Sequence, residues 1–324
     1  MLLAINRFLG KWLPILTPAS VIIGILAAPL FQPFTALVPW LFALITFAGS
    51  LQSNITTARH AMAHPLTLFV SLTILHVLTP LWAWSIGHLF FYGDVYTTTG
   101  LILAVVIPTG ITSVIWVSMY HGNIPIALAI IFIDTMLSPL IVPYSIHLLV
   151  GQSIQMDVAS LILGLLFMIV VPTIAGMTTN QIIRDKSVVK NVTIILSPIA
   201  KMSLPFIIAI NSSSLASYMK RIDFNFVKIT LVVLLISISG FGFCWILSHL
   251  FKQSNENAVA LIFTGGMRNI STGVVVAVTY FSPQVALPVV MGMLFQQTLA
   301  AANGHYIRMR QINKIDQKIV KHSR

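Results

Sequence analysis

Two residues that carry a charge at neutral pH stand inside strongly apolar segments of the sequence. Arg268 follows Thr264-Gly-Gly-Met and precedes Asn269, and Asp134 lies within a second apolar run. An arginine keeps its proton at any ordinary pH and presents a fork of donors that suits an anionic group. A buried carboxyl group is ionised beside a cation and tends to hold a proton without one. These residues predict anion binding at Arg268, and ion pairing or proton transfer at Asp134.

Two further residues with titratable side chains lie in apolar runs. Lys201 stands between Pro198 and Pro205. It either faces a cleft and meets an anionic ligand, or extends its apolar stem so that the ammonium group reaches an interface. His76 lies in the run Leu-Thr-Ile-Leu-His-Val-Leu-Thr-Pro. We expect its ring to bond to a neighbouring backbone carbonyl, and a proton relay is the alternative.

The composition determines the kind of protein that positions these residues. The chain has 324 residues, of which 57% are hydrophobic and 8% are charged, whereas soluble domains carry roughly 25% charged residues. Apolar runs of about 20 residues recur along the chain, and each is long enough to span a bilayer as a helix. The sequence predicts an all-α integral membrane protein with ten spans, at 12–31, 34–52, 66–92, 98–120, 124–150, 157–178, 191–215, 226–250, 256–281 and 283–307.

The lysines and arginines outside these spans are distributed unevenly between the two sides. Short cytoplasmic loops carry an excess of Lys and Arg, which predicts a multi-pass protein of the cell membrane with both termini in the cytoplasm. The basic charge then reflects topology and contact with anionic lipid, and a nucleic-acid partner is not expected. The predicted cytoplasmic residues are Arg7, Lys11, Arg59, Arg184, Lys186, Lys190, Lys252, Arg308, Arg310, Lys314, Lys318, Lys321 and Arg324, and the predicted external residues are Lys220, Arg221 and Lys228.

The first and second halves of the chain have matching features. Residues 1–155 and 156–310 each contain five predicted spans, followed by a basic cytoplasmic tail at 311–324. The fourth span of the first half contains Pro-Thr-Gly-Ile-Thr-Ser at 108–113, and the fourth span of the second half contains the Gly-rich run at 264–273. Because each half has an odd number of spans, the second half would enter the membrane in the opposite direction to the first. Inverted repeats with interrupted helices are typical of secondary transporters, in which the exposed backbone binds substrate or ion near the bilayer midplane.

Several runs together resemble the bile acid:sodium symporter family over nearly the whole chain. The resemblance implies an organic-anion transporter that works by alternating access. Its core is built from spans 3–5 and 8–10, with the broken spans 4 and 9 crossing at the centre, and its panel from spans 1, 2, 6 and 7, with the substrate between them. The runs are Thr46-Phe-Ala-Gly-Ser-Leu-Gln52, His64-Pro65, Thr79-Pro-Leu-Trp-Ala-Trp84, the run at 108–113 with His121-Gly-Asn123, Ser138-Pro139 and Gly266-Met-Arg-Asn269.

The sequence departs from the family at positions where sodium-using members hold two ions. The Ser-Asn pair of span 4 is Ser113-Val114 here, and the two hydroxyl positions of span 5 are Ala127 and Ile131. The Glu and Gln of span 9 are Thr264 and Arg268, and the Gln of span 3 is Leu75; Ser113 and Asn269 are retained. Sodium needs several oxygen ligands, as hard cations do. The resemblance therefore implies that the usual sodium sites are not used.

Arg268 would then supply the positive charge that sodium supplies elsewhere, with Asp134 as its direct counter-charge. If Asp134 is free of that pair, proton coupling through it remains open. No metal or other cofactor is expected. The candidate substrate-binding residues are Arg268, Asn269, Thr264, Thr112, Ser113 and Lys201, and the candidate coupling residues are Asp134 and His76.

Other functions were weighed against transport of an organic anion. A sodium-coupled symporter with altered ligands and a non-transporting membrane receptor remain alternatives. An arsenite exporter of related fold uses a cysteine at the broken span 4, where this chain has Thr112-Ser113, while its single cysteine is Cys244. An intramembrane enzyme is not expected, because no His-Glu-x-x-His run and no paired acids lie in the spans. The sequence leaves the oligomeric state open, a monomer included.

Overall fold

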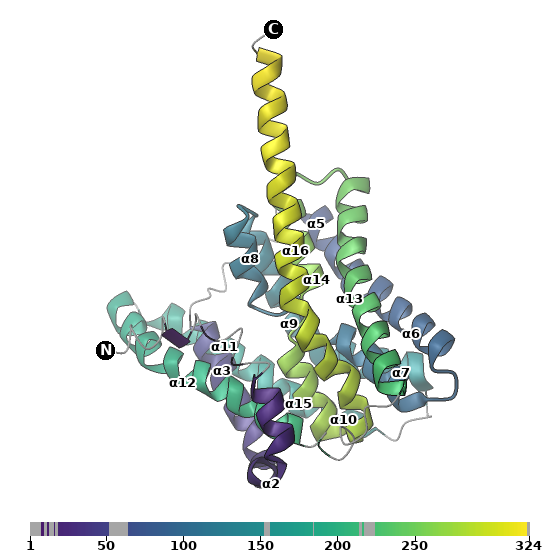
Figure 1. Ribbon diagram of the computed structural model, residues 1–324. Helices are drawn as coiled ribbons and strands as arrows, with labels where there is room; N and C mark the ends of the chain where they lie inside the picture. The colour runs from purple at the N-terminus through teal and green to yellow at the C-terminus, as the bar shows by residue number, and fades with distance from the viewer. Residues whose placement is uncertain are drawn as a thin grey trace.

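The computed structural model describes residues 8–9, 12, 16, 19–51, 64–151, 156–183, 185–213, 216 and 224–322. Throughout these residues the secondary structure is helical, apart from one isolated β-bridge (Figure 1). Seven of the described helical segments are long and apolar enough to cross a membrane. The prediction of an all-helical, multi-pass membrane protein is therefore confirmed, whereas the inverted repeat of ten spans stays a prediction.

The helices follow one another with short connections. In chain order they are Ala28–Phe31 (α2), Gln32–Leu37 (η1), Val38–Ser50 (α3), Pro65–Thr73 (α5), Ile74–Leu78 (η2), Thr79–Phe90 (α6), Val95–Val106 (α7), Ser113–Met119 (α8), Ile124–Val150 (α9), Val158–Leu165 (α10), Leu166–Val170 (η4), Val171–Ile182 (α11), Lys186–Ser213 (α12), Phe224–Leu250 (α13), Asn255–Gly266 (α14), Ile270–Tyr280 (α15) and Pro283–His322 (α16).

Packing divides these helices into two groups. In the first, α3 packs against α11, α12 and η4; in the second, α7 packs against α6, α9 and α16, and α13 packs against α14 and α16. Figure 1 shows α3, α11 and α12 on one side of α16 and α13 on the other. The groups meet where α10 contacts α9 and where α12 contacts α15. They contain the segments that the resemblance assigns to panel and core, respectively.

Two of the expected spans are interrupted, at the places where the sequence has its Gly-containing polar runs. The chain leaves helical geometry between α7 and α8 and again between α14 and α15. After the second break the side chain of Asn269 fixes the start of α15, because it accepts from the backbone N–H of Thr272; Asn123 caps α9 in the same way through the N–H of Ile126. Such N-caps satisfy donors that have no partner within the helix. The last helix, α16, continues to His322, through the predicted basic tail.

The described part of the chain contains two wide π-helical turns, each just before a proline. In η2 the N–H of Thr79 bonds to the carbonyl of Ile74, and in η4 the N–H of Val171 bonds to the carbonyl of Leu166. Pro80 and Pro172 follow. A proline has no N–H for the carbonyl four residues earlier, and its ring crowds that carbonyl. A wider turn relieves the crowding, and single π turns are frequent at functional sites.

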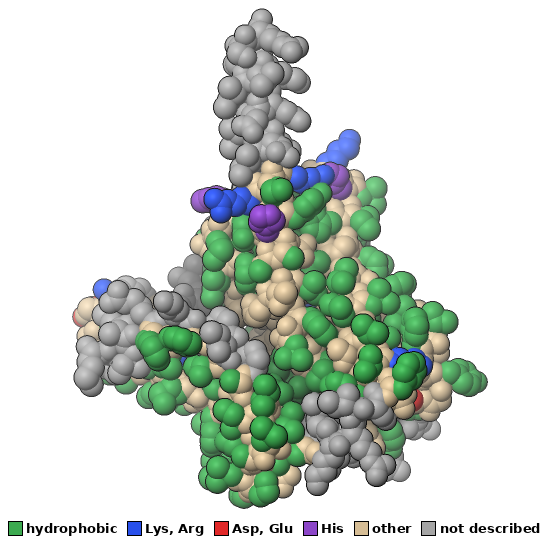
Figure 2. Space-filling view, in the orientation of Figure 1, with side chains coloured by type: hydrophobic (Ala, Val, Ile, Leu, Met, Phe, Trp, Pro, Cys, Tyr) green, Lys and Arg blue, Asp and Glu red, His purple; other side chains and the backbone are tan. Residues whose placement is uncertain are grey.

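The surface matches a protein that lies in lipid. Figure 2 shows apolar side chains over most of the body, with Lys, Arg and His side chains gathered where α16 leaves it. Among the exposed large apolar residues are Leu26, Trp40 and Phe224, whereas His305, Arg308 and Arg310 are exposed near the projecting end of α16. An apolar belt of this kind is stable in contact with hydrocarbon rather than with water.

Candidate functional site

The two breaks lie against each other and are joined by backbone hydrogen bonds. The N–H of Asn269 donates to the carbonyl of Pro108 at 2.7 Å, and the N–H of Gly110 donates to the carbonyl of Met267 at 3.1 Å. Between them Thr109 and Arg268 form an antiparallel β-bridge. The breaks thus satisfy in part each other's backbone groups, as they must in a segment that water does not reach.

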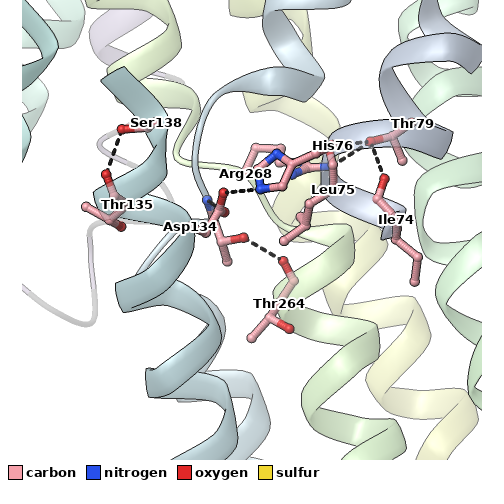
Figure 3. A network of polar contacts seen from close by, with 10 residues as sticks. Ile74, Leu75, His76, Thr79, Asp134, Thr135, Ser138, Thr264 and Arg268 are labelled. Atoms are coloured by element: carbon pink, nitrogen blue, oxygen red, sulfur yellow. Dashed lines mark hydrogen bonds and ion pairs between the residues drawn. The ribbon is translucent and has the colours of Figure 1, made fainter. Parts of the chain in front are cut away.

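Asp134 extends from α9 to the first break. Its Oδ2 accepts a hydrogen bond of 2.6 Å from the backbone N–H of Thr109, and its Oδ1 lies 3.3 Å from Nε2 of His76 (Figure 3). The side chain is 1% exposed. The hydroxyl of Thr109 donates to the carbonyl of Thr264 at 3.0 Å. One residue of the first break therefore contacts both α9 and α14.

Two expectations about these residues need correction. Arg268 forms no direct ion pair with Asp134 in the described part of the chain; the basic partner of Asp134 is His76. Neither ring nitrogen of His76 has a hydrogen-bond partner among the described residues, so the expected bond to a backbone carbonyl is not formed. His76 lies in the π turn of η2. The apolar run around it does not predict which way this turn directs the side chain.

Arg268 is buried in the same cluster, with only 6% of its surface exposed. Its Nη2 donates to the hydroxyl of Thr79 at 2.8 Å, and its backbone N–H donates to Oε1 of Gln296 at 2.8 Å. The Thr79 hydroxyl lies 2.9 Å from the carbonyl of Ile74, to which it donates. The Nη1 group of Arg268 is buried and has no partner among the described residues.

A small hollow, with a cavity volume of about 50 Å³, opens beside Arg268. Its walls come from α7, α13 and α16 and from the second break, with Thr79 and Gln296 as polar neighbours of Arg268. Two glycines of α14 let α13 approach closely: a side chain at Gly265 would meet Cys244, and one at Gly266 would meet Phe241. The second break is therefore tightly held on one side and open toward the hollow on another.

Comparison with known proteins identifies the family of this chain and several relatives. The sequence model of the Sodium Bile acid symporter family matches residues 38–222. The chain belongs to this family. It is 49% identical to the uncharacterized protein YbaS of Bacillus subtilis (strain 168), over 94% of this chain and 100% of that protein. Membership of the sodium bile acid symporter family identifies this chain as a multi-pass membrane transporter.

More distant relatives carry transporter names. The chain is 23% identical to the uncharacterized sodium-dependent transporter YocS of Bacillus subtilis (strain 168), over 88% of this chain and 87% of that protein. It is 26% identical to the probable sodium/metabolite cotransporter BASS1, chloroplastic, of Arabidopsis thaliana, over 75% of this chain and 60% of that protein.

Three of the positions at which sodium-using members of the sodium bile acid symporter family were expected to carry ligands are buried and apolar. Leu75 and Ala127 are fully buried, and Ile131 is nearly so. The hydroxyl of Thr264 donates to the carbonyl of Ala260 at 2.8 Å. Ser113 is buried, and its hydroxyl has no partner among the described residues. The side chains therefore offer few of the oxygen ligands that a hard cation requires.

The predicted site residues fall into two sets. Asp134, His76, Thr264, Arg268 and Asn269 come together at the crossing. By contrast, Thr112 is exposed and Ser113 is buried at the start of α8, and Lys201 is half-buried on α12, in the other packing group. Across the described residues, no group of three or more His, Cys, Asp or Glu side chains is placed to hold a metal.

Three contact residues were not predicted from the sequence: Thr79, Thr109 and Gln296. Each contacts Arg268 or Asp134 through one hydrogen bond. Thr109 lies within the quoted run at 108–113, and Thr79 immediately precedes Pro80. A proline inside an apolar helix was the available signal for Thr79, because it predicts a local change in the backbone bonding.

Proposed function

We propose that this protein is a secondary active transporter of a small organic anion, which it binds at the crossing and moves by alternating access. The observation that carries the proposal is the buried guanidinium of Arg268, whose Nη1 has no partner among the described residues. An ionisable side chain in a membrane-spanning region is costly, and such residues mark substrate and ion pathways. An anion at Arg268 would offset part of that cost.

We propose that this chain differs from its named relatives in its coupling ion. The names of YocS and BASS1 indicate sodium dependence, which favours a sodium-coupled symporter as the second candidate. We favour transport without the two sodium sites, because Leu75, Ala127 and Ile131 offer no oxygen ligand and Arg268 already brings a positive charge to the crossing.

Proton coupling follows from the charges of the cluster. Arg268 and Asp134 contribute one charge of each sign, and a neutral His76 adds none. A bound anion would leave the buried cluster with a net negative charge, and one proton taken up by the His76–Asp134 pair would restore neutrality. Binding of proton and anion would then favour each other by thermodynamic linkage. The pair distance of 3.3 Å supports this assignment.

The orientation in the membrane is part of the same proposal. The excess of Lys and Arg on one predicted side supports a cell-membrane protein with both termini in the cytoplasm. The substrate approaches between the two packing groups, where Lys201 on α12 would meet an anion before it reaches Arg268.

The experiment that tests the function is counterflow of radiolabelled small carboxylates in liposomes that contain the purified protein. Exchange that depends on the protein identifies a transporter, and its absence for every carboxylate would instead favour the receptor alternative. The same liposomes, in sodium or potassium buffer and with or without an inward proton gradient, separate the coupling ions. We expect uptake to follow the proton gradient and to be equal in sodium and potassium.

A binding measurement provides an independent control. A ligand that binds only the folded state raises the melting temperature by mass action. We expect millimolar sodium to leave the melting temperature unchanged relative to potassium between pH 5 and pH 8. Stabilisation by sodium would contradict the interpretation of Val114, Ala127, Ile131 and Arg268 and would establish the sodium-coupled candidate.

A further inference from the structure

The hollow beside Arg268 is lined by residues of the second packing group and by no described residue of the first. Its walls are α7, α13, α16 and the second break, and Figure 1 shows α13 on the opposite side of α16 from α3 and α12. A substrate held only between the two groups would leave this hollow unused. Its position next to an arginine with an unpartnered donor makes it a candidate position for the anion that binds at Arg268.

The polar groups of the hollow favour a single anionic group. Arg268 offers Nη1. The amide of Gln296 accepts from the N–H of Arg268 through Oε1, which leaves its Nε2 as a donor. The hydroxyls of Thr79 and Ser237 donate to backbone carbonyls of their own helices. One donor from the Arg268 cation and one from the neutral amide of Gln296 suit a single carboxylate. None of the residues that line this hollow is acidic.

The remaining walls favour an apolar ligand body. Leu101, Val105, Ile236 and Phe241 line the hollow, and apolar walls with a few placed polar groups are the usual composition of small-molecule sites. Lys201 is not among the lining residues. The hollow therefore offers a second carboxylate no partner, and it would leave such a group desolvated and unpaired.

We propose that this hollow binds a monocarboxylate with a short apolar chain, whose carboxylate contacts Arg268 and Gln296. The assignment names a substrate class for the proposed transport function and rests on that function for its physiological role. Binding itself is measurable whether or not the protein transports the ligand.

A pair of glycines on α13 provides matched variants. A Cβ atom built on Gly240 or on Gly242 meets no atom within 4 Å, so either position accepts a side chain. Gly240 lines the hollow and Gly242 does not. Gly240→Leu should fill the hollow, whereas Gly242→Leu places the same side chain on the same helix outside it.

The experiment measures the melting temperature of the full chain in detergent, in potassium propanoate, potassium chloride or potassium butanedioate at equal ionic strength. We expect propanoate to raise the melting temperature of the wild type and Gly242→Leu, and to lose this effect in Gly240→Leu. Chloride and butanedioate should give no comparable rise. Arg268→Lys, which keeps the charge but not the fork of donors, should reduce the propanoate shift.

Three outcomes would overturn the assignment. The first is that propanoate does not stabilise the wild type. The second is that propanoate stabilises Gly240→Leu as strongly as Gly242→Leu, and the third is that chloride produces the same shift as propanoate. Liposome counterflow separates this assignment from the proposed function. Exchange that persists unchanged in Gly240→Leu refutes the hollow but keeps the transporter, whereas a propanoate shift specific to the hollow without any exchange keeps the site and refutes transport.

Discussion

The two interruptions of the membrane helices have the same backbone role and different chemistry. Each break bonds to the other, through Asn269 to Pro108 and through Gly110 to Met267. The first break contributes a neutral donor, the N–H of Thr109, which holds the carboxylate of Asp134. The second contributes a cation, Arg268. An acidic group and a basic group are thus held near each other by backbone that belongs to different halves of the chain.

The surroundings of the two breaks also differ. The helix that follows the first break, α8, has seven residues, and its Ile115 and Met119 are exposed. The helices on either side of the second break are largely buried, and α13 packs closely against Gly265 and Gly266. The comparison indicates that the cation is held where the helices on both sides of the break are largely buried.

The largest expected effect is at Asp134, which connects α9 to the first break. Asp134→Leu would remove the acceptor for the N–H of Thr109 and leave Arg268 without a nearby negative charge. Removing one partner from a buried charged cluster costs about 3–5 kcal/mol. We expect a loss of this size in the free energy of unfolding, measured by thermal unfolding in detergent.

A matched control for Asp134 lies one turn further along α9. Ser138 is also buried, and its hydroxyl bonds to the carbonyl of Thr135 within its own helix. Ser138→Ala should change the free energy of unfolding by less than about 1 kcal/mol. Equal effects of the two variants would show that Asp134 does not connect the break to α9.

The next effect distinguishes the two possible partners of Asp134. A double-mutant cycle of Asp134→Asn with His76→Phe should give a coupling energy of about 1–3 kcal/mol, because contacting groups couple within this range. The cycle of Asp134→Asn with Arg268→Gln should give less, since the two side chains are not in direct contact. A stronger coupling to Arg268 than to His76 would restore the ion pair first expected from the sequence.

A smaller effect separates the helix starts that follow the breaks. Asn269 caps α15 through the N–H of Thr272, whereas Thr112, at the start of α8, makes no side-chain cap bond. Asn269→Ala should destabilise the protein by about 0.5–2 kcal/mol. Thr112→Ala should be nearly neutral, and the difference in melting temperature between the two variants checks the asymmetry.

The smallest effect concerns a charged cap far from both breaks. Asp157 begins α10, and hydrogen bonds from the hydroxyl and then the N–H of Ser160 lower the pKa of its carboxyl group. A lowered pKa in the folded state stabilises the protein above the ordinary pKa of about 4, and this stabilisation is lost as the pH falls through the folded pKa.

The difference in melting temperature between the wild type and Asp157→Asn should therefore shrink as the pH is lowered from 7 toward 3. The side chain of Asn269 does not titrate, so the difference in melting temperature between the wild type and Asn269→Ala should not depend on pH in this way. A pH-independent difference for Asp157→Asn would mean that its charge contributes nothing to the cap.

The sequence was sufficient to predict a helical membrane protein and the two interruptions of its helices, because long apolar runs and glycine-containing polar runs are local signals. The cluster of Asp134, His76, Thr264, Arg268 and Asn269 also follows from residues whose burial in lipid requires a reason. The family resemblance implied that the broken spans 4 and 9 cross each other.

The partners within the cluster could not be predicted in the same way. Pairing depends on which face of α9 and of η2 turns toward the breaks, and a helix that is apolar on all sides has no amphipathic pattern to show it. The π turn before Pro80 shifts the face of the helix further. For that reason Asp134 was assigned to Arg268 rather than to His76, and Thr79 and Gln296 were missed.

The bonds between the two breaks also constrain how the protein is made. Thr109 is separated by 155 residues from Thr264, whose carbonyl accepts from its hydroxyl. A ribosome adds roughly 5–20 residues per second, so the first break is synthesised on the order of ten seconds before its partner. During that interval the carbonyl of Pro108 and the N–H of Gly110 lack the bonds that they make in the finished protein. Biogenesis therefore includes a stage in which the first half needs water or another protein to cover its polar break.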